Sequence, residues 1–360
     1  MAWRYWIVAL MILALAACMP PTTPVPAGSA SGPSEAEAPT LVMMTHDSFA
    51  ISESLIEQFE AETGATVKIL EAGDAGSALN QAILSRNNPL ADVSFGVDNT
   101  FFGRAIDADI FEPYASPLLE EIPDELELDP EHRLLPVDFG YVCLNYDKAY
   151  FEEKGLPVPQ TLEDLTKPEY KGLLVVENPA TSSPGLAFLM TTVAYFGEDG
   201  YLEFWRQLRE NDVYVTDGWE DAYYGQFSGG SGEGTRPIVV SYATSPAAEV
   251  YFSEEPVTES PTGNILPEGG SFRQIEFVGI LKGTRQRDLA EKWIDFMLSR
   301  PFQEDIPLQM WVYPANSTAA LPEVFTKYAQ VPTSPAQLPP DVIDANREKW
   351  IDAWTTVVLR

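Results

Sequence analysis

Strand-like and helix-like patterns alternate from Thr40 onward, and this alternation constrains the fold more than any other feature of the sequence. The runs "TLVMMTH" (40–46), "ATVKILEA" (65–72) and "DVSFGV" (92–97) indicate buried strands, and the segments between them carry apolar residues at helical spacing. Repeated strand–helix units favour an open, largely parallel sheet with helices on both faces. We therefore predict an α/β protein.

A second series of strand patterns follows, and it extends the prediction to two α/β lobes joined by extended segments. Its members are "GYVCLNY" (140–146), "GLLVVEN" (172–178), "DVYVT" (212–216), "PIVVSY" (237–242) and "FRQIEFVGIL" (272–281). No segment repeats another. Because ligands of open α/β sheets bind beyond the carboxyl ends of strands, the loops after these strands are the candidate site.

The N-terminus is typical of an exported lipoprotein. Residues 1–17 combine one charge, Arg4, with an apolar run that is shorter than the roughly 20 residues needed to span a bilayer. We predict a signal peptide there. "LAAC" resembles the lipobox of bacterial lipoproteins, in which Cys18 is acylated; the alternative is an ordinary signal with a chance cysteine. Residues 18–39 are rich in Pro, Ser, Thr and Ala, which predicts a disordered linker. The chain would then be lipid-anchored on the outer face of the cytoplasmic membrane.

The net charge restricts the classes of binding partner, and the cysteine content indicates whether disulfides are present. The chain has 54 acidic and 22 basic residues and a net charge of −32, which disfavours nucleic acids and anionic membrane surfaces. The same charge is compatible with a cationic ligand. Cys143 lies in an apolar strand-like run, so we predict a buried, inert thiol and no disulfide framework.

Motifs of catalysis and metal binding are missing from the sequence. It has two histidines and no HExxH, CxxC, phosphate loop or GxGxxG after a strand. "GGSGEG" (229–234) lacks the second glycine of a nucleophile elbow. A secreted hydrolase with paired carboxylates is an alternative, although so many acids supply such pairs by chance. We predict a protein that is not an enzyme, without a metal site or cofactor.

Polar residues in the predicted loops after strands could bind a ligand. Asp74 lies in "GDAGS", and Thr181, Ser182 and Ser183 begin a helix with spare hydroxyl and N–H groups that suit an anion. Ser245 follows the strand at 237–242. Each of these residues could instead be a helix cap, which is the commonest role of such residues.

Aromatic residues occupy further loops of this kind. "TDGWEDAYYGQF" (216–227) sets Trp219 among acids and tyrosines, and Tyr242, Trp311 and Tyr313 follow later. Any one of them could be a core residue. Together with the acids, they predict a cleft for a flat, positively charged ligand, because an aromatic face attracts a cation by roughly 0.5–2 kcal/mol.

The order of several motifs resembles the thiamine-binding proteins of bacterial ABC importers, within the extracellular solute-binding protein family. The motifs are "THDSFA", "DVSFGVDN", "VDFGYVCLNYDK", "NPATSSPGLAFL", "VTDGWEDAYYGQF", "SYATSPA" and "PFQEDIPLQMWVYPAN", and the resemblance runs from about residue 40 to the C-terminus. It implies the two-lobed periplasmic-binding-protein fold (type II, Venus-flytrap), in which each lobe is a mixed sheet flanked by helices. We expect residues 40–137 plus about 270–312 to form lobe 1 and 138–269 to form lobe 2. The C-terminal helical segment 313–360 would pack on the lobes.

The resemblance also implies a function. The lobes would close on thiamine, thiamine monophosphate or thiamine diphosphate, and a monomer would deliver the ligand to an ABC permease and its ATPase. The implied ligand contacts are Asp74, Ala75, Ser182, Ser183, Trp219, Tyr242, Ala243, Thr244, Ser245 and Trp311. His46 stands at a binding position where the family has a tyrosine. Ala248 replaces a family aromatic, and Tyr251, about one helical turn later, is a candidate substitute.

Two rival ligands share the predicted fold. Tyr223 and Tyr224 are adjacent, as in ferric-binding relatives that chelate iron with two tyrosines. If the segment is helical, however, neighbouring side chains diverge by about 100°, and one ring would pack inward. A polyamine would also suit acids and aromatics.

Overall fold

The computed structural model describes residues 38–253 and 257–360. The predicted signal peptide, Cys18 and nearly all of the predicted linker lie outside the described residues. Within the described ranges, no helix combines the length and apolar character needed to cross a membrane.

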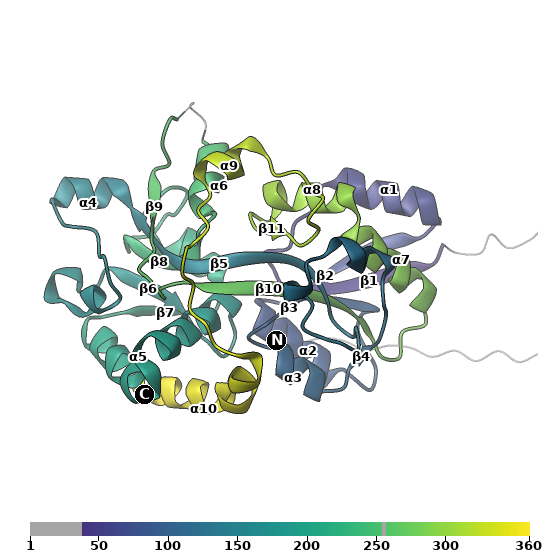
Figure 1. Cartoon of the computed structure of the whole chain (residues 1–360), viewed down its shortest axis with the longest axis horizontal. Coiled ribbons are helices and arrows are strands. Elements are labelled where there is room, and N and C mark those ends of the chain that lie inside the picture. Colours follow the sequence, from purple (N-terminus) through teal and green to yellow (C-terminus); the bar gives the residue numbers. More distant parts are fainter. Residues whose placement is uncertain (1–37, 254–256) are drawn as a thin grey trace, which may run out of the picture. The chain divides into compact units, whose positions relative to one another are not determined.

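The first half of the sheet contains the strand–helix alternation that the sequence predicts (Figure 1). Its elements are β1 (Thr40–Thr45), α1 (Glu53–Thr63), β2 (Thr66–Glu71), α2 (Ala75–Leu84), β3 (Val93–Asp98), α3 (Phe102–Asp107) and β4 (Phe111–Glu112). The strand order is β2-β1-β3, with all three strands parallel. β10 (Phe272–Leu281) returns from late in the chain and pairs antiparallel with β3.

The second half repeats this plan with other strands. Its elements are β5 (Leu135–Asp147), α4 (Lys148–Lys154), β6 (Leu174–Glu177), α5 (Ser183–Glu210), β7 (Tyr214–Thr216), β8 (Ile238–Tyr242), α6 (Ser245–Tyr251) and β9 (Thr262–Ile265). β8, β6 and β7 are parallel, and β5 pairs antiparallel with β8. The five strands predicted in the second series are all present, as β5, β6, β7, β8 and β10.

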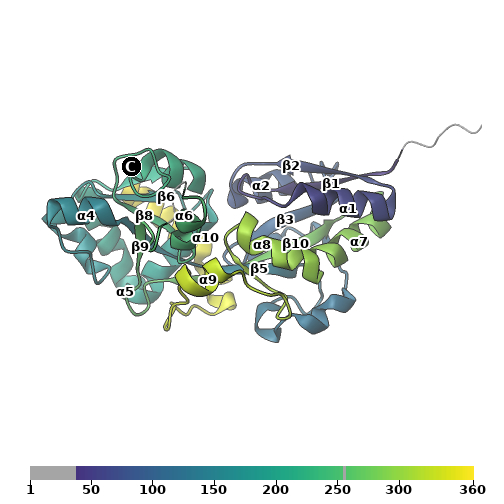
Figure 2. The ribbon, with the colours of Figure 1, turned by 90° about the horizontal axis from the view of Figure 1, so that it is seen from above.

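The long strands β5 and β10 join the two halves. The beginning of β5 pairs with β10, and its later part pairs with β8 and β9. Figure 2 shows β1, β2, α1, α2 and α7 gathered on one side and β6, β8, α4, α5 and α6 on the other. The sheet is mixed and flanked by helices, so the predicted fold class is confirmed.

The remaining elements of the described ranges are four α-helices and one short strand, β11, which pairs antiparallel with β5. They are α7 (Arg287–Leu298), α8 (Arg300–Gln309), β11 (Tyr313–Pro314), α9 (Glu323–Tyr328) and α10 (Pro340–Val358). Short 3₁₀ helices span Pro117–Glu121, Asp124–Leu126, Glu163–Thr166 and Pro168–Tyr170, and a π-helix spans Asp221–Gln226. α10 packs on α5, where the ring centroids of Trp354 and Trp205 are 5.5 Å apart.

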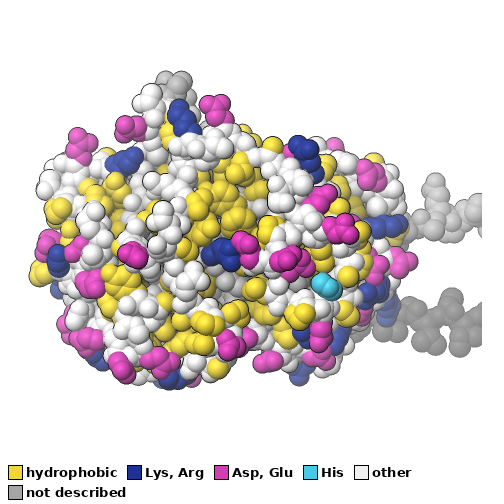
Figure 3. All heavy atoms as spheres, in the orientation of Figure 1, with side chains coloured by type: hydrophobic (Ala, Val, Ile, Leu, Met, Phe, Trp, Pro, Cys, Tyr) yellow, Lys and Arg dark blue, Asp and Glu magenta, His cyan; other side chains and the backbone are white. Residues whose placement is uncertain are grey.

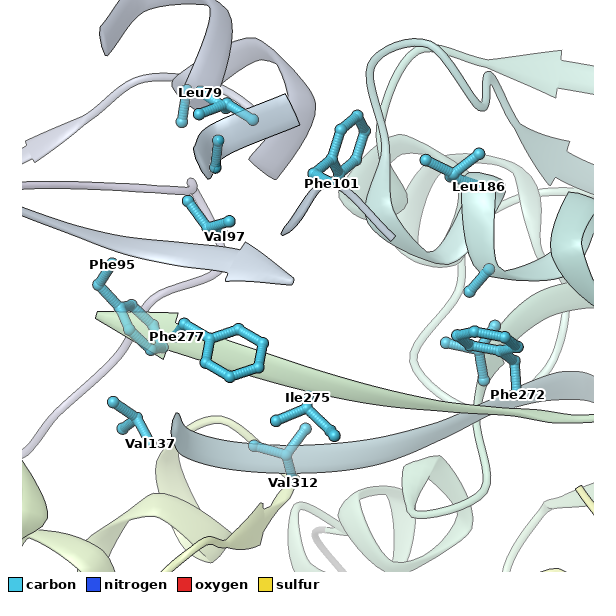
Figure 4. Close-up of a cluster of buried hydrophobic side chains, with 14 of the residues drawn as sticks. Leu79, Phe95, Val97, Phe101, Val137, Leu186, Phe272, Ile275, Phe277 and Val312 are labelled. Atoms are coloured by element: carbon cyan, nitrogen blue, oxygen red, sulfur yellow. The ribbon is translucent and has the colours of Figure 1, made fainter. Parts of the chain in front are cut away.

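One hydrophobic cluster runs through both halves of the sheet. Figure 4 shows part of it, with Phe272 and Phe277 on β10 between Phe95 of β3 and Leu186 of α5. Cys143 is fully buried, as predicted, and burial raises the pKa of its thiol. On the face that Figure 3 shows, basic side chains are scattered singly among acidic ones, in keeping with the net charge of −32.

Candidate functional site

Loops from both halves of the sheet line a cavity of about 290 Å³. Seven aromatic side chains contribute to its walls: Phe49, Trp219, Tyr223, Tyr224, Tyr242, Phe252 and Trp311. Five acidic side chains join them: Asp47, Asp74, Glu220, Glu249 and Glu276. Neither Lys nor Arg occurs among the described residues that line the cavity. Aromatic faces and carboxylates both attract cations, so this lining favours a flat, positively charged ligand.

Asp74 lies where three segments meet. It is the N-cap of α2, and its Oδ1 accepts a hydrogen bond of 2.7 Å from the backbone N–H of Ala75. The same carboxylate accepts from the backbone N–H groups of Ser183 (3.3 Å) and Trp219 (3.0 Å). Burial raises the pKa of Asp74 to about 6, and these hydrogen bonds oppose the shift. Asp74 therefore connects the first half of the sheet to the second beside the cavity.

The N-terminus of α5 has fewer spare donors than the sequence analysis expected, because of its three hydroxyl groups only the buried one of Ser182 has no hydrogen-bond partner. The Ser183 hydroxyl donates to Asp98, and the Thr181 hydroxyl donates to the carbonyl of Asp217 at 2.7 Å. The N–H of Ser183 is already engaged by Asp74. Two carboxylates of the protein thus take the place predicted for an anion, and this end of the cavity disfavours a phosphate.

Trp219 is held in the wall by its neighbours. Its indole N–H donates to the Ser241 hydroxyl at 2.9 Å, and its ring stacks on Tyr223 with centroids 5.2 Å apart and planes inclined by 23°. The following residues form the π-helix Asp221–Gln226, which turns Tyr223 into the protein and leaves Tyr224 46% exposed. This is the inward packing of one ring that a helical segment predicts.

Trp311 lies in the wall on a strained backbone. Its φ of 60° is in the left-handed region, which is unfavourable for a tryptophan. The Thr244 hydroxyl donates to its carbonyl, and its ring stacks on Phe325 with planes inclined by 19° and centroids 5.8 Å apart. Phe252 packs against the same ring at 5.3 Å. These contacts hold the indole at the cavity.

The floor of the cavity contains His46 and Glu276. Nε2 of His46 is 3.5 Å from Oε1 of Glu276 and has no hydrogen-bond partner. Burial lowers the pKa of His46 to about 4, so the imidazole is neutral at pH 7. Gly96 makes room for this ring, because a Cβ atom there would lie 2.4 Å from Cδ2 of His46.

Most of the predicted site residues come together at this cavity. Those that line it are His46, Asp74, Ala75, Ser183, Trp219, Tyr242, Thr244, Ser245 and Trp311. Ser182 and Ala243 do not line it and are fully buried behind it. The Ala243 backbone instead pairs with Tyr141, and its carbonyl accepts from Asn264.

Glu249, Phe252 and Glu276 are among the cavity residues that the sequence analysis missed. Glu276 and Glu249 are buried carboxylates, and a charged residue within the apolar run "FRQIEFVGIL" is a signal that could have revealed Glu276. Tyr251, the predicted substitute for the aromatic lost at Ala248, contacts Trp311 but does not line the cavity. Phe252, one residue later, lines it instead.

A scan against family models matches residues 88–339 to the bacterial extracellular solute-binding proteins. The chain belongs to this family. It is 31% identical to the thiamine-binding periplasmic protein of Salmonella typhimurium over 89% of this chain and 94% of the relative. A solved periplasmic thiamin binding protein superposes with a TM-score of 0.79 at 27% identity, covering 92% of this chain and all of that one. The ferric binding protein of Campylobacter jejuni (TM-score 0.69, 20% identity, 88% of this chain and 99% of that one) shares the fold.

The predicted resemblance is thus confirmed in sequence and in fold. Family membership indicates a small-molecule ligand, a role in transport in place of catalysis, and a location outside the cytoplasm. Among the described residues, no group of three or more His, Cys, Asp or Glu is placed to hold a metal ion.

Proposed function

We propose that the protein captures thiamine between two lobes outside the cytoplasmic membrane and delivers it to an ABC-importer permease and its ATPase. The observation that carries this proposal is the lining of the cavity. The described residues that line it include seven aromatic and five acidic side chains and neither Lys nor Arg. Thiamine has two flat rings, an aminopyrimidine and a permanently cationic thiazolium. The thiamine-binding names of the relatives support the same ligand.

Six of the predicted binding residues have a role in this proposal. Trp219, Tyr242 and Trp311 offer ring faces to the pyrimidine or the thiazolium, and Asp74 balances charge or accepts a hydrogen bond. Thr244 and Ser245 supply hydroxyl groups. Because Asp74 and Asp98 already engage Ser183 at the start of α5, unphosphorylated thiamine fits better than its mono- or diphosphate.

The two halves of the sheet support a delivery mechanism in which two lobes close on the ligand. We assign lobe 1 to residues 40–137 plus about 270–312 and lobe 2 to 138–269, with 313–360 packing on both. A ligand that contacts both lobes favours the closed form over the open one. In this proposal the protein is a monomer, and Cys18 carries a lipid that tethers it to the membrane after removal of residues 1–17.

An iron-binding function has less support. Tyr223 is buried, and its hydroxyl donates to Glu249 at 2.7 Å. The rings of Tyr223 and Tyr224 are inclined by 83°. The solved ferric-binding structure is below 25% identity and therefore supports the fold alone.

Calorimetric titration of the purified protein, freed of ligand by unfolding and refolding, tests the proposal. We expect one thiamine to bind per chain, with weaker binding of thiamine diphosphate and no response to ferric citrate. Trp219→Ala should lower the thiamine affinity about tenfold or more, which corresponds to about 1.4 kcal/mol.

Tyr214→Ala is the matched control, because Tyr214 is 41% exposed and lies outside the cavity. Its affinity should equal that of the wild type. A response to iron or spermidine without one to thiamine would replace the proposed ligand.

A further inference from the structure

Three carboxylates form a row across the strands that join the two halves of the sheet. Glu276 of β10 is paired in register with Asp98 of β3 on one side and with Asp138 of β5 on the other. Directly paired residues of neighbouring strands project from the same face of a sheet, so the three carboxylates are neighbours. All three are buried, with exposures of 0% for Asp98 and Asp138 and 7% for Glu276.

Only one member of this row reaches the cavity. Glu276 lines it, beside the imidazole of His46, whose Nε2 has no hydrogen-bond partner and lies 3.5 Å away. His46 is itself 9% exposed. A buried acid and an unpartnered buried imidazole therefore face the same ligand space.

The row has no basic partner within the described part of the chain. No ion pair joins Asp98, Asp138 or Glu276 to a Lys or Arg. Arg347 has a long-range electrostatic interaction with Asp98, but its guanidinium forms an ion pair with Glu348.

The other groups that face Glu276 do not supply a positive charge. His46 is neutral at pH 7, because burial lowers its pKa to about 4. Asp74 adds a further negative charge, and Tyr242 donates its hydroxyl to Gln274 at 3.2 Å.

Like charges this close cannot all ionise in a buried site. Burial, followed by repulsion from Asp138, raises the pKa of Glu276 well above its usual range, and burial raises the pKa of Asp138 to about 7. At neutral pH, without a cation beside it, the row of acids thus retains at least one proton. A ligand with a fixed positive charge would stabilise the ionised form.

We propose that Glu276 is the counter-ion of the bound ligand, and that the positive charge of the ligand replaces a proton retained by the neighbouring carboxyl groups of Glu276 and Asp138. The O–H bond of the carboxyl group breaks, the proton leaves to the solvent, and the carboxylate left behind is neutralised by the cation. This inference rests on the proposed function, since thiamine supplies the permanent charge in its thiazolium ring.

Glu249 is a second buried carboxylate of the same cavity, and its surroundings differ from those of Glu276. Its Oε1 accepts hydrogen bonds from the hydroxyl groups of Tyr223 (2.7 Å) and Ser231 (2.8 Å). Both donors belong to the protein, so this oxygen has hydrogen-bond partners without a ligand. Glu249→Gln is therefore the comparison variant, which should alter binding without abolishing proton release.

Titration calorimetry of thiamine into the protein at pH 7, repeated in phosphate, Hepes and Tris, measures the protons exchanged. The slope of the observed enthalpy against the ionisation enthalpy of the buffer should show release of about half a proton to one proton per thiamine. The affinity should rise with pH between about 5.5 and 7, by up to tenfold per pH unit. Glu276→Gln should bind more weakly, release far less than half a proton at pH 7 and lose most of the pH dependence, with the remainder due to Asp74, whose pKa is about 6.

A neutral analogue, in which a thiophene ring replaces the thiazolium, separates charge from shape in the wild-type protein. It should bind without releasing a proton. Thiamine that binds without proton release, or a neutral analogue that releases as many protons as thiamine, would overturn this inference and leave the proposed function standing. Absence of thiamine binding would overturn both.

Discussion

Gly96 of β3 is the single residue where a methyl group would most disturb the floor of the cavity. Its φ is 93°, and a Cβ atom would lie 2.4 Å from Cδ2 of His46. Gly96→Ala would combine backbone strain of about 1–3 kcal/mol with displacement of the His46 ring. We expect the variant to lose both free energy of unfolding, measured in urea, and affinity for thiamine, measured by calorimetry.

Gly64 provides the control for backbone strain alone. It ends α1 with a φ of 70°, and no atom would lie within 4 Å of an added Cβ. Gly64→Ala should cost about 1–2 kcal/mol of unfolding free energy and leave the affinity unchanged. If Gly96→Ala bound thiamine as tightly as Gly64→Ala, the position of His46 would not matter for binding.

Single residues also show which parts of this site can be predicted from the sequence. Asp74 and Trp219 were predictable because each follows a strand, and the ends of parallel strands converge. Glu276 was missed because it lies inside a strand, where only the pairing with Asp98 and Asp138 reveals an acidic row. Phe252 was missed because α6 ends at Tyr251, and the chain direction beyond a helix depends on tertiary contacts.

At the scale of elements, the packing of α10 on α5 yields a prediction about two tryptophans. Both are buried, but the indole N–H of Trp205 donates to the Thr192 hydroxyl at 2.9 Å, whereas that of Trp354 has no partner. Trp354→Phe therefore loses packing alone, and Trp205→Phe also loses a hydrogen bond. We expect the unfolding free energy to fall by about 1 kcal/mol more in Trp205→Phe, measured by urea denaturation.

Thiamine affinity serves as the control for both variants, since neither residue lines the cavity. Equal losses of stability in the two variants would mean that the Trp205 hydrogen bond contributes nothing net.

The elements themselves were largely predictable, because period-2 and period-3.6 patterns reflect burial along each segment. The strand at 272–281 was predicted with the bounds that β10 has. β5 was predicted only from residue 140, yet it begins at Leu135. Its first part contains a proline and a buried aspartate, and pairing with β10 places those residues in the sheet. Such long-range pairing is not visible in a local pattern.

At the scale of the whole molecule, buried acids and net charge together predict how stability depends on pH. Burial raises the pKa of Asp74 to about 6 and that of Asp138 to about 7, and it also raises the pKa values of Asp98, Glu177 and Glu276. A carboxyl group with a higher pKa in the folded state than in the unfolded state binds more protons when folded, so it stabilises the fold as pH falls. Lower pH also reduces the repulsion within a chain of net charge −32.

His46 has the opposite effect on the pH dependence of stability. Its folded pKa of about 4 lies below the usual histidine value of 6.5, so protonation favours the unfolded chain as pH falls through this window. Between pH 8 and about 6.5, the buried acids act almost alone. We therefore expect the free energy of unfolding of the ligand-free protein to rise by about 2 kcal/mol or more from pH 8 to 6. It should go on rising below pH 6, with His46 in partial opposition, until the carboxyl groups of the unfolded chain take up protons near pH 4.

Urea denaturation at a series of pH values measures this profile, and Glu276→Gln should flatten it by removing one raised carboxyl group. Saturating thiamine should flatten it too, because a cation beside Glu276 stabilises the carboxylate at high pH and removes the advantage of the protonated row. A profile that rises toward pH 8 would mean that the buried acids are ionised at little cost. Because thiamine should bind more tightly as the pH rises, the two profiles should lie furthest apart at high pH and approach each other at low pH, and only the ligand-free one should bend near pH 7.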